Sequence, residues 1–338
     1  MNWSKLKQPP WRTILPAVCF LGMLLLGFWL WSPGSDVRDG RHNRAKNGIW
    51  IGHGWLGADE WFHDNDKVGQ IPKFRDADRI RELAQLCKQN GIRDVFPHLC
   101  PASGTGDLPP MNDTQVKRFL VEFAGIRVIP WIGGPSGASV DHSNPAWRAR
   151  FVAQTRDLLT RYPGFHGVQL NVEPMTSGDR DFLLLLEELH SALPAGKLLS
   201  IAAYPPPTRW QPLPDVHWEE PYFREVARRV DHLAVMMYDT ALRVPKIYQR
   251  LMADWTEEVL LWSESKPVLL GVPTYDDAQT EYHRPDVENL TNALLGIHAG
   301  LERRPLPTNY EGIAIYCEWE TDGSEWEIWQ TRFLRASR

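Results

Sequence analysis

The sequence contains little cysteine and none of the motifs that usually hold a metal or a cofactor. Four cysteines occur in 338 residues, and the three beyond the apolar N-terminal segment, Cys87, Cys100 and Cys317, are irregularly spaced. Such spacing matches neither a disulfide framework nor a zinc site. The sequence also has no H-E-x-x-H segment, which would place two histidines on one helix face around a zinc ion. We therefore predict that the protein uses no metal and no cofactor.

Long basic runs are absent too. Lysine and arginine number 37 against 42 aspartate and glutamate residues, which gives a formal net charge of −5 at pH 7. A protein that binds nucleic acid needs concentrated positive charge to meet the phosphates, so we do not expect a nucleic-acid partner. Aromatic residues are abundant instead, with 16 Trp and 9 Tyr. They could fill a large core, or their flat faces could stack on sugar rings in a cleft, and composition alone does not separate these two uses.

A long uncharged run lies near the N-terminus. Residues 13–31 carry no charged side chain, and about twenty apolar residues are enough to cross a bilayer as a helix. No A-x-A cleavage site follows the run, so an uncleaved signal-anchor is preferred over a cleaved signal peptide. We predict a short tail (1–12), a transmembrane anchor (13–31), a polar linker (32–46) and one folded domain (47–338). The membrane would then be a partner through this helix, and the folded domain would be periplasmic or extracellular.

Beyond the linker, short apolar segments alternate with amphipathic segments of helical length. The predicted strands are 48–55, 92–99, 127–134, 167–174, 198–205, 232–239, 267–275 and 310–319. The predicted helices that follow them lie near 76–90, 113–124, 144–161, 179–193, 219–229, 245–264, 286–302 and 323–335. Eight strand–helix units over roughly 290 residues predict an α/β fold, a single (β/α)8 TIM barrel. A doubly wound open sheet is the competing arrangement, but no G-x-G-x-x-G follows the first predicted strand.

Polar and aromatic residues collect at the C-terminal ends of these predicted strands. The residues are His53, Trp55, His98, Trp131, Glu173, Tyr204, Asp239, Tyr275 and Glu318. In a TIM barrel these ends ring one face, and that face holds the active site. The pattern therefore predicts a functional cleft at the C-terminal face.

The fourth predicted strand carries the most informative of these ends. Because side chains alternate along a strand, Gln169, Asn171 and Glu173 share one face while aliphatic residues share the other. Polar groups inside a barrel must be hydrogen-bonded or they cost several kcal/mol, so an interior polar network explains the pattern equally well. Glu173 is the last of the three, at the open end, where its surroundings could raise its pKa and let it act as an acid.

Four short segments at predicted strand ends carry a family resemblance. They are WIGG (131–134), HGVQLNVE (166–173), MMYD (236–239) and GVPTY (271–275). In this order they are similar to the S-x-G-G, D-G-x-D-x-D-x-E, M-x-Y-D and G-x-P-x-Y motifs of glycoside hydrolase family 18. This is the chitinase and endo-β-N-acetylglucosaminidase type of TIM barrel. The resemblance covers essentially all of residues 47–338.

The strand-four signature is degenerate in this chain. Its three aspartates are replaced by His166, Gln169 and Asn171, and only Glu173 is retained. The first motif has Trp131 where the family has serine. On the last strand, Tyr316 stands where the family usually has tryptophan.

The resemblance implies a glycoside hydrolase that acts on N-acetylhexosamine-containing oligo- or polysaccharides. Glu173 would be the general acid, and the substrate's own 2-acetamido oxygen would be the nucleophile of this retaining reaction. Asn171 would orient the acetamide group, and Tyr238 and Asp239 would contact it. Further candidates for binding the substrate are Gln169, Trp131, Tyr204, Tyr275, Tyr316, Glu318, Trp319 and Trp55.

Two alternative functions follow from the departures. The chain could be a non-catalytic carbohydrate-binding relative, because the signature aspartates are missing. It could also be a two-carboxylate retaining barrel glycosidase, in which Asp276, Asp277 or Glu318 serves as the nucleophile. That alternative predicts a carboxyl pair about 5 Å apart that includes Glu173.

Overall fold

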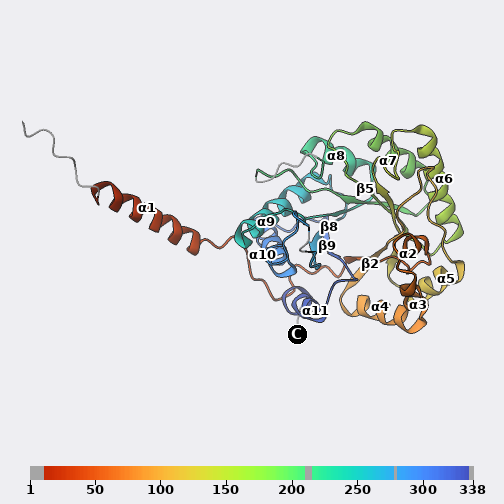
Figure 1. Ribbon diagram of the computed structural model, residues 1–338, viewed down its shortest axis with the longest axis horizontal. Coiled ribbons are helices and arrows are strands. Elements are labelled where there is room, and N and C mark those ends of the chain that lie inside the picture. Colours follow the sequence, from red (N-terminus) through yellow and green to blue (C-terminus); the bar gives the residue numbers. More distant parts are fainter. Residues whose placement is uncertain (1–10, 210–214, 278–279, 335–338) are drawn as a thin grey trace, which may run out of the picture.

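The computed structural model describes residues 11–209, 215–277 and 280–334 (Figure 1). Residues 1–10 of the predicted tail and residues 335–338 at the end of the predicted domain lie outside this part of the chain.

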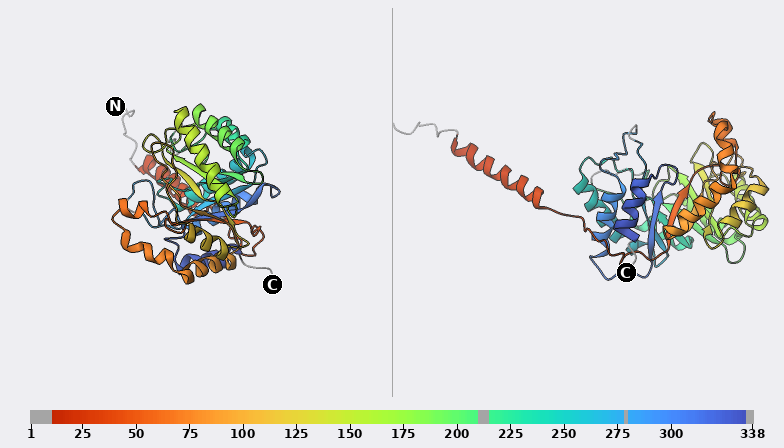
Figure 2. Two further views of the ribbon diagram at one scale, coloured as in Figure 1. Left: turned by 90° about the vertical axis from the view of Figure 1, so that its right-hand side faces the viewer. Right: turned by 90° about the horizontal axis from the view of Figure 1, so that it is seen from below.

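Within the described residues, nine parallel strands form one curled sheet that helices surround (Figures 1 and 2). The strands are β1 (Asn47–Ile51), β2 (Ile92–Pro97), β3 (Arg127–Val128), β4 (Trp131–Pro135), β5 (Gly167–Glu173), β6 (Leu198–Ala203), β7 (His232–Val235), β8 (Val268–Pro273) and β9 (Tyr310–Tyr316). Their order in the sheet is β3-β2-β1-β9-β8-β7-β6-β5-β4. The first strand therefore pairs with both the second and the last, which favours a barrel over a doubly wound sheet.

The two strands at the ends of this order, β3 and β4, follow each other in the chain. Together they occupy the predicted strand 127–134, and Pro130, which has no N–H to donate, lies between them. β3 pairs with β2, and β4 pairs with β5. A bridge between His98 and Trp131 also links the end of β2 to β4. With β3 and β4 counted as halves of one strand, every predicted strand is found, and the α/β architecture fits a TIM barrel.

A helix follows each of the predicted strands in the described part of the chain. These helices are α4 (Ala77–Gln89), α5 (Asp113–Glu122), α6 (Pro145–Arg161), α7 (Arg180–Ala192), α8 (Glu220–Arg229), α9 (Pro245–Trp262), α10 (Leu290–Leu301) and α11 (Gly323–Trp329), and a π-turn (Gln330–Leu334) extends α11. In α7, Asp179 caps the N-terminus by accepting from the backbone N–H of Phe182. Leu185 and Leu189 then face the sheet at helical spacing and are fully buried.

The segment between β1 and α4 is more structured than the sequence pattern indicated. It contains α2 (Glu60–Asp64), a 3-10 turn (Val68–Gln70) and α3 (Ile71–Arg75). Phe62 and Phe74 are buried on each other, with ring centroids 5.2 Å apart. This packing fixes the segment against the barrel beside the ends of β1 and β2.

The N-terminal region departs from the prediction in two ways. Helix α1 (Trp11–Leu30) stands apart from the barrel (Figures 1 and 2), but no helix among the described residues combines the length and apolar character needed to cross a membrane. The predicted transmembrane span at 13–31 is therefore not supported. The segment predicted as a linker also packs on the barrel, because Val37 and His42 are buried and Arg332 pairs with Asp36 at 2.7 Å.

Candidate active site

Glu173 is the last residue of β5, at the C-terminal face of the sheet. Its Oε1 accepts a hydrogen bond from Asn171 Nδ2, and its Oε2 accepts from the hydroxyl of Tyr204 at 3.4 Å. Solvent reaches the side chain, but protein atoms surround the carboxyl group on its other sides. This poor hydration, helped by the negative charge of Asp239, raises the pKa of Glu173 against the opposing effect of its two hydrogen bonds. A carboxyl group of this kind can hold a proton to give to a substrate.

Asn171 is placed by the close approach of β4 to β5. Gly133 pairs with Asn171 and has a φ of +121°, a backbone conformation that side chains disfavour. A Cβ at Gly133 would overlap the carbonyl oxygen of Asn171, so the glycine of WIGG is required there. The Oδ1 atom of Asn171 is buried and has no hydrogen-bond partner among the described residues, which leaves it available to accept from a ligand.

Glu173 lines two cavities, of about 440 Å³ and about 360 Å³. The first is also lined by His53, Trp61, His98, Trp131 and Asn171, and the second by Tyr204, His217, Tyr238, Asp239 and Tyr282. A further cavity of about 830 Å³ shares His53, Trp61 and His98 with the first. The three cavities therefore adjoin, and Glu173 lies between two of them. Together these three cavities are called the mouth of the barrel below.

Four of the predicted substrate-binding residues line the largest of these cavities. They are Trp55, Tyr316, Glu318 and Trp319. The oxygen of Glu318 accepts from the backbone N–H of Gly52 at 3.2 Å and from Trp55 Nε1 at 3.3 Å. Burial raises the pKa of Glu318 in spite of these bonds. Glu318 lines neither of the two cavities at Glu173.

Aromatic rings meet around Tyr316. Tyr238 stacks on Tyr316 at 5.1 Å between ring centroids, and Tyr275 and Trp319 contact it edge-on at 5.3 and 5.5 Å. Trp131 contacts it edge-on at 6.4 Å, and its Nε1 has no partner within the described chain. The cluster gives the mouth flat apolar faces and a free donor, both of which suit a sugar.

Asp239 follows β7 and is held by two neighbours. Its Oδ1 accepts a hydrogen bond from the hydroxyl of Tyr275 and lies 3.2 Å from Nδ1 of His283. Tyr275 is itself buried, and burial is the first of the causes that raise its pKa, so the hydroxyl stays protonated and can donate to Asp239. Asp239 and Tyr238 line the same cavity as Glu173.

Gln169 is the predicted site residue that the structure does not bring to the mouth. It is fully buried inside the barrel, where its Oε1 accepts from Trp50 Nε1 at 2.6 Å and its Nε2 donates to Ser200 Oγ at 3.2 Å. With both ends of the amide engaged and no exposed surface, it cannot contact a substrate. At this position the structure supports the alternative given above, a hydrogen-bonded polar network inside the barrel.

Other residues at the mouth could not be predicted as site residues. Trp61 stacks on His53 at 4.0 Å with an angle of 11° between the rings, and Lys67 lies 4.7 Å from the Trp61 centroid. Tyr282 and His283 come from the loop between β8 and α10. Only the high tryptophan content hinted at Trp61, and no pattern marked Lys67, Tyr282 or His283. Burial lowers the pKa of His53 to about 3, so this ring is neutral.

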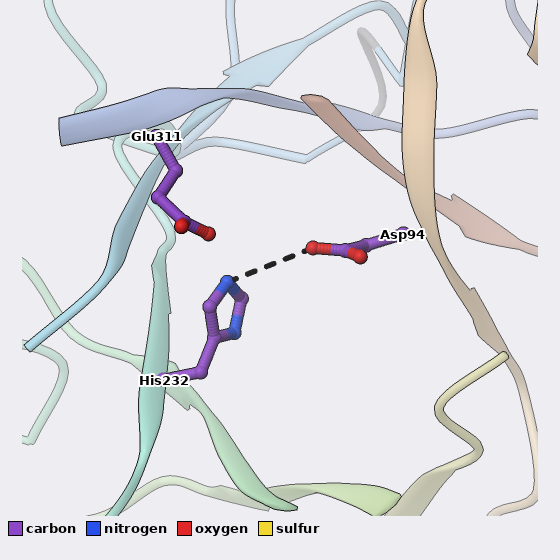
Figure 3. Close-up of side chains that lie close together, drawn as sticks. All are labelled: Asp94, His232 and Glu311. Atoms are coloured by element: carbon purple, nitrogen blue, oxygen red, sulfur yellow. Dashed lines mark ion pairs between the residues drawn. The ribbon is translucent and has the colours of Figure 1, made fainter. Parts of the chain in front are cut away.

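A separate polar cluster lies in the first halves of β2, β7 and β9, at the opposite end of the barrel (Figure 3). His232 Nε2 lies 3.9 Å from Asp94, and Glu311 is close to both. Three side chains could coordinate a cation, but Arg93 and Arg127 already bind Asp94. The cations near Glu311 are Arg93 and Lys46. Three positive charges thus face two carboxylates, which disfavours a divalent ion and favours a structural ion-pair network.

Comparison with known proteins places the fold among glycosidases. A family model described as glycosyl hydrolases family 18 matches residues 98–326. A chitinase from Chromobacterium violaceum is similar with a TM-score of 0.56 and 16% identity, over 87% of this chain and 99% of that one. The spore cortex-lytic enzyme SleL of Bacillus cereus gives a TM-score of 0.53 and 12% identity, over 85% and 74% of the two chains.

A chitinase from Rhizomucor miehei is also similar, with a TM-score of 0.53 and 14% identity over 85% of this chain and 97% of that one. At such identities the structural likeness supports the fold alone. The comparison with curated proteins found no match.

Proposed function

This chain belongs to glycosyl hydrolases family 18, and from that membership we propose that it hydrolyses glycans containing N-acetylhexosamine, with Glu173 as the general acid. The observation that carries the proposal is the position of Glu173. Its carboxyl group lies between two adjoining cavities and has a raised pKa. A glycan that spans both cavities would present a glycosidic oxygen to a protonated carboxyl group.

The acetamide group of the substrate would act as the nucleophile in this proposal. Asn171 offers a free carbonyl oxygen that can accept the acetamide N–H. Asp239 and Tyr238 lie on the other side of Glu173, in the cavity of about 360 Å³. These groups would position the acetamide so that its oxygen attacks the anomeric carbon while Glu173 gives its proton to the leaving oxygen.

The geometry gives less support to a mechanism with two enzyme carboxylates. Neither Asp276 nor Asp277 is among the residues that line the two cavities at Glu173. Glu318 lines the third cavity and is already bound by a backbone N–H and Trp55. A carbohydrate-binding role without turnover is the second candidate, because Asn171 gives no negative charge to stabilise a developing cation.

The experiment compares Glu173→Gln with the wild type on a β-linked aryl oligosaccharide of N-acetylglucosamine. The amide keeps the shape of the side chain but has no acidic proton, so kcat should fall by at least about a hundredfold while affinity for the glycan is retained. Glu327→Gln is the matched control, because Glu327 is an exposed carboxylate on α11 that lines none of the three cavities. This control should hydrolyse the substrate at the wild-type rate.

Three outcomes decide between the candidates. Equal turnover by Glu173→Gln and the wild type would show that Glu173 is not the acid. Glycan binding without turnover by the wild type would establish the carbohydrate-binding alternative. Equal hydrolysis of an analogue with a 2-hydroxyl in place of the 2-acetamido group would favour two enzyme carboxylates, because the substrate-assisted route needs the acetamide.

A further inference from the structure

A buried polar cluster lies behind Asp239. It consists of Asp239, His283 and Glu288, whose nitrogen and oxygen atoms lie within 4.8 Å of one another. The imidazole of His283 is buried and stacks on Tyr275, with ring centroids 4.0 Å apart and 23° between the rings. The cluster thus joins the loop after β7 to the loop before α10.

The hydrogen-bond partners of His283 determine where its protons lie. Nε2 is 3.0 Å from the backbone carbonyl oxygen of Tyr275, and a carbonyl can only accept, so Nε2 must carry a hydrogen. Nδ1 lies 3.2 Å from Asp239 Oδ1, in the geometry of an ion pair rather than of a well-aligned hydrogen bond. In a neutral ring, the lone pair of Nδ1 would face a carboxylate oxygen and repel it. A proton on Nδ1 makes the same contact attractive.

The other groups around His283 favour this second proton. Glu288 is fully buried, with Oε2 accepting from the backbone N–H of Thr240 at 2.9 Å and Oε1 without a partner among the described residues. Burial would lower the pKa of His283, but contact with Asp239, and the charge of Glu288 where it is ionised, raise it overall. Burial raises the pKa of Glu288 itself to about 7, so Asp239 is the main counter-charge of His283 at neutral pH. The phenol of Tyr275 stacks on His283 and that of Tyr248 lies close to Glu288 and Asp239, and neither offers a positive charge. The neighbouring cation is Arg284, the next residue in the chain, whose Nε is buried without a hydrogen-bond partner among the described residues.

The same contacts fix the orientation of Asp239. Tyr275 and His283 both meet its Oδ1, which leaves Oδ2 for a ligand in the cavity that Asp239 lines. Its backbone has a φ of +61°, which is uncommon for a residue other than glycine. The carboxylate is therefore set by its surroundings rather than by its own backbone preference.

We propose that His283 is a positioning residue, which as an imidazolium holds Asp239 in the charge state and orientation that receive the substrate's acetamide group. The reference to the acetamide rests on the proposed function. The ion pair itself rests only on the contacts of His283, so the two can be tested apart. A metal ion bound by the same three side chains is the competing explanation of the cluster.

The ion pair is tested by NMR of the full chain with 15N-labelled histidine, in which His283→Gln assigns the ring signals. In the wild type, both ring nitrogens of His283 should be protonated at neutral pH and insensitive to Zn²⁺ or EDTA. In Asp239→Asn, the negative charge is lost and burial dominates, so the proton affinity of His283 should fall at least tenfold. Equal midpoints in the two proteins, or signals that move with stoichiometric Zn²⁺, would overturn the proposal.

The positioning role is tested by glycan binding in a Glu173→Gln background, where turnover does not interfere. His283→Gln should weaken binding of an N-acetylglucosamine oligosaccharide at least fivefold and leave binding of the 2-hydroxy analogue unchanged. His190→Gln, at an exposed histidine 3.1 Å from Asp231, is the control and should change neither. Equal loss for both ligands would mean that His283 has only a structural role. Absence of all glycan binding would instead contradict the proposed function, while the NMR result would still decide the ion pair.

Discussion

At the scale of single residues, Asn171 acts directly on the carboxyl group of Glu173. The amide donates to one carboxylate oxygen of Glu173, and this bond favours the ionised acid and opposes the effect of burial on its pKa. The family signature has an aspartate at this position, which would bring a second carboxyl group against the first. In this chain the position holds an amide that donates a hydrogen bond to Glu173 and carries no charge.

Asn171→Asp should retain or increase hydrolysis and should move the alkaline limb of the pH profile upward. A neighbouring negative charge raises the pKa of Glu173. Because a general acid works in its protonated form, activity is lost as pH rises through that pKa, so the loss should occur at a pH about one unit higher. The measurement is kcat/KM as a function of pH. Superimposable profiles for variant and wild type would contradict this account of Asn171.

At the scale of elements, the pairing of β4 with β5 sets the floor of the site. Gly133 and Gly134 both have φ above +120°, and the small residue at 133 lets β4 approach the backbone of Asn171. After the interruption at Pro130, β4 begins at Trp131, and its Gly133 pairs with Asn171 of β5. The local sequence of β4 is thus explained by close contact with its neighbour.

Gly133→Ala should destabilise the protein by about 3 kcal/mol or more, because a strained φ and an overlap with Asn171 both contribute. Gly125→Ala is the matched control, since Gly125 has a φ of +88° but a Cβ added there would have nothing within 4 Å. It should cost only about 1–2 kcal/mol. Urea denaturation measures both values. A similar loss for the two variants would mean that the approach of β4 to β5 contributes nothing specific.

At the scale of the whole molecule, the segment predicted as a linker, from residue 35 onward, packs on the barrel. Val37 is buried, and Ser35 donates through its hydroxyl to Glu302 at 2.5 Å. A segment with the composition of a linker therefore contributes to packing.

Two truncations test whether residues 35–46 contribute to the stability of the barrel. Deleting residues 1–34 should leave a protein that unfolds cooperatively with the stability of the full chain. Deleting residues 1–46 also removes Val37 and the Asp36–Arg332 pair, and should lower the free energy of unfolding by about 2 kcal/mol, mostly from lost apolar burial. Denaturation in urea compares the three chains. Equal stability of both truncated forms would show that residues 35–46 are a passive linker.

The sequence predicted the strands and the helices that follow them, because alternation of apolar segments reports burial directly. It also predicted Glu173 and Asp239 at strand ends, and the structure places both of them at one cavity. It did not decide whether Gln169 reaches the cavities or stays inside the barrel. Gln169 and Glu173 share a strand face, yet only Glu173 reaches the cavities. Trp61 lies in the short helix α2 and His283 lies in the loop between β8 and α10, and the positions of both depend on contacts with distant residues. No periodic pattern in the sequence marks such contacts, so only the structure shows that these two residues lie at the site.

The pairing of the first strand with the last affects how the chain can fold while it is being synthesised. Asn47 Oδ1 accepts from the backbone N–H of Ile313, 266 positions later in the chain. A ribosome releases the N-terminal end first, so β1 has no partner on this side until nearly all of the protein has emerged. During that interval an apolar strand edge is open to pairing with another chain. A chain that terminates before β9 would therefore have an open sheet prone to aggregation, rather than a shorter closed barrel.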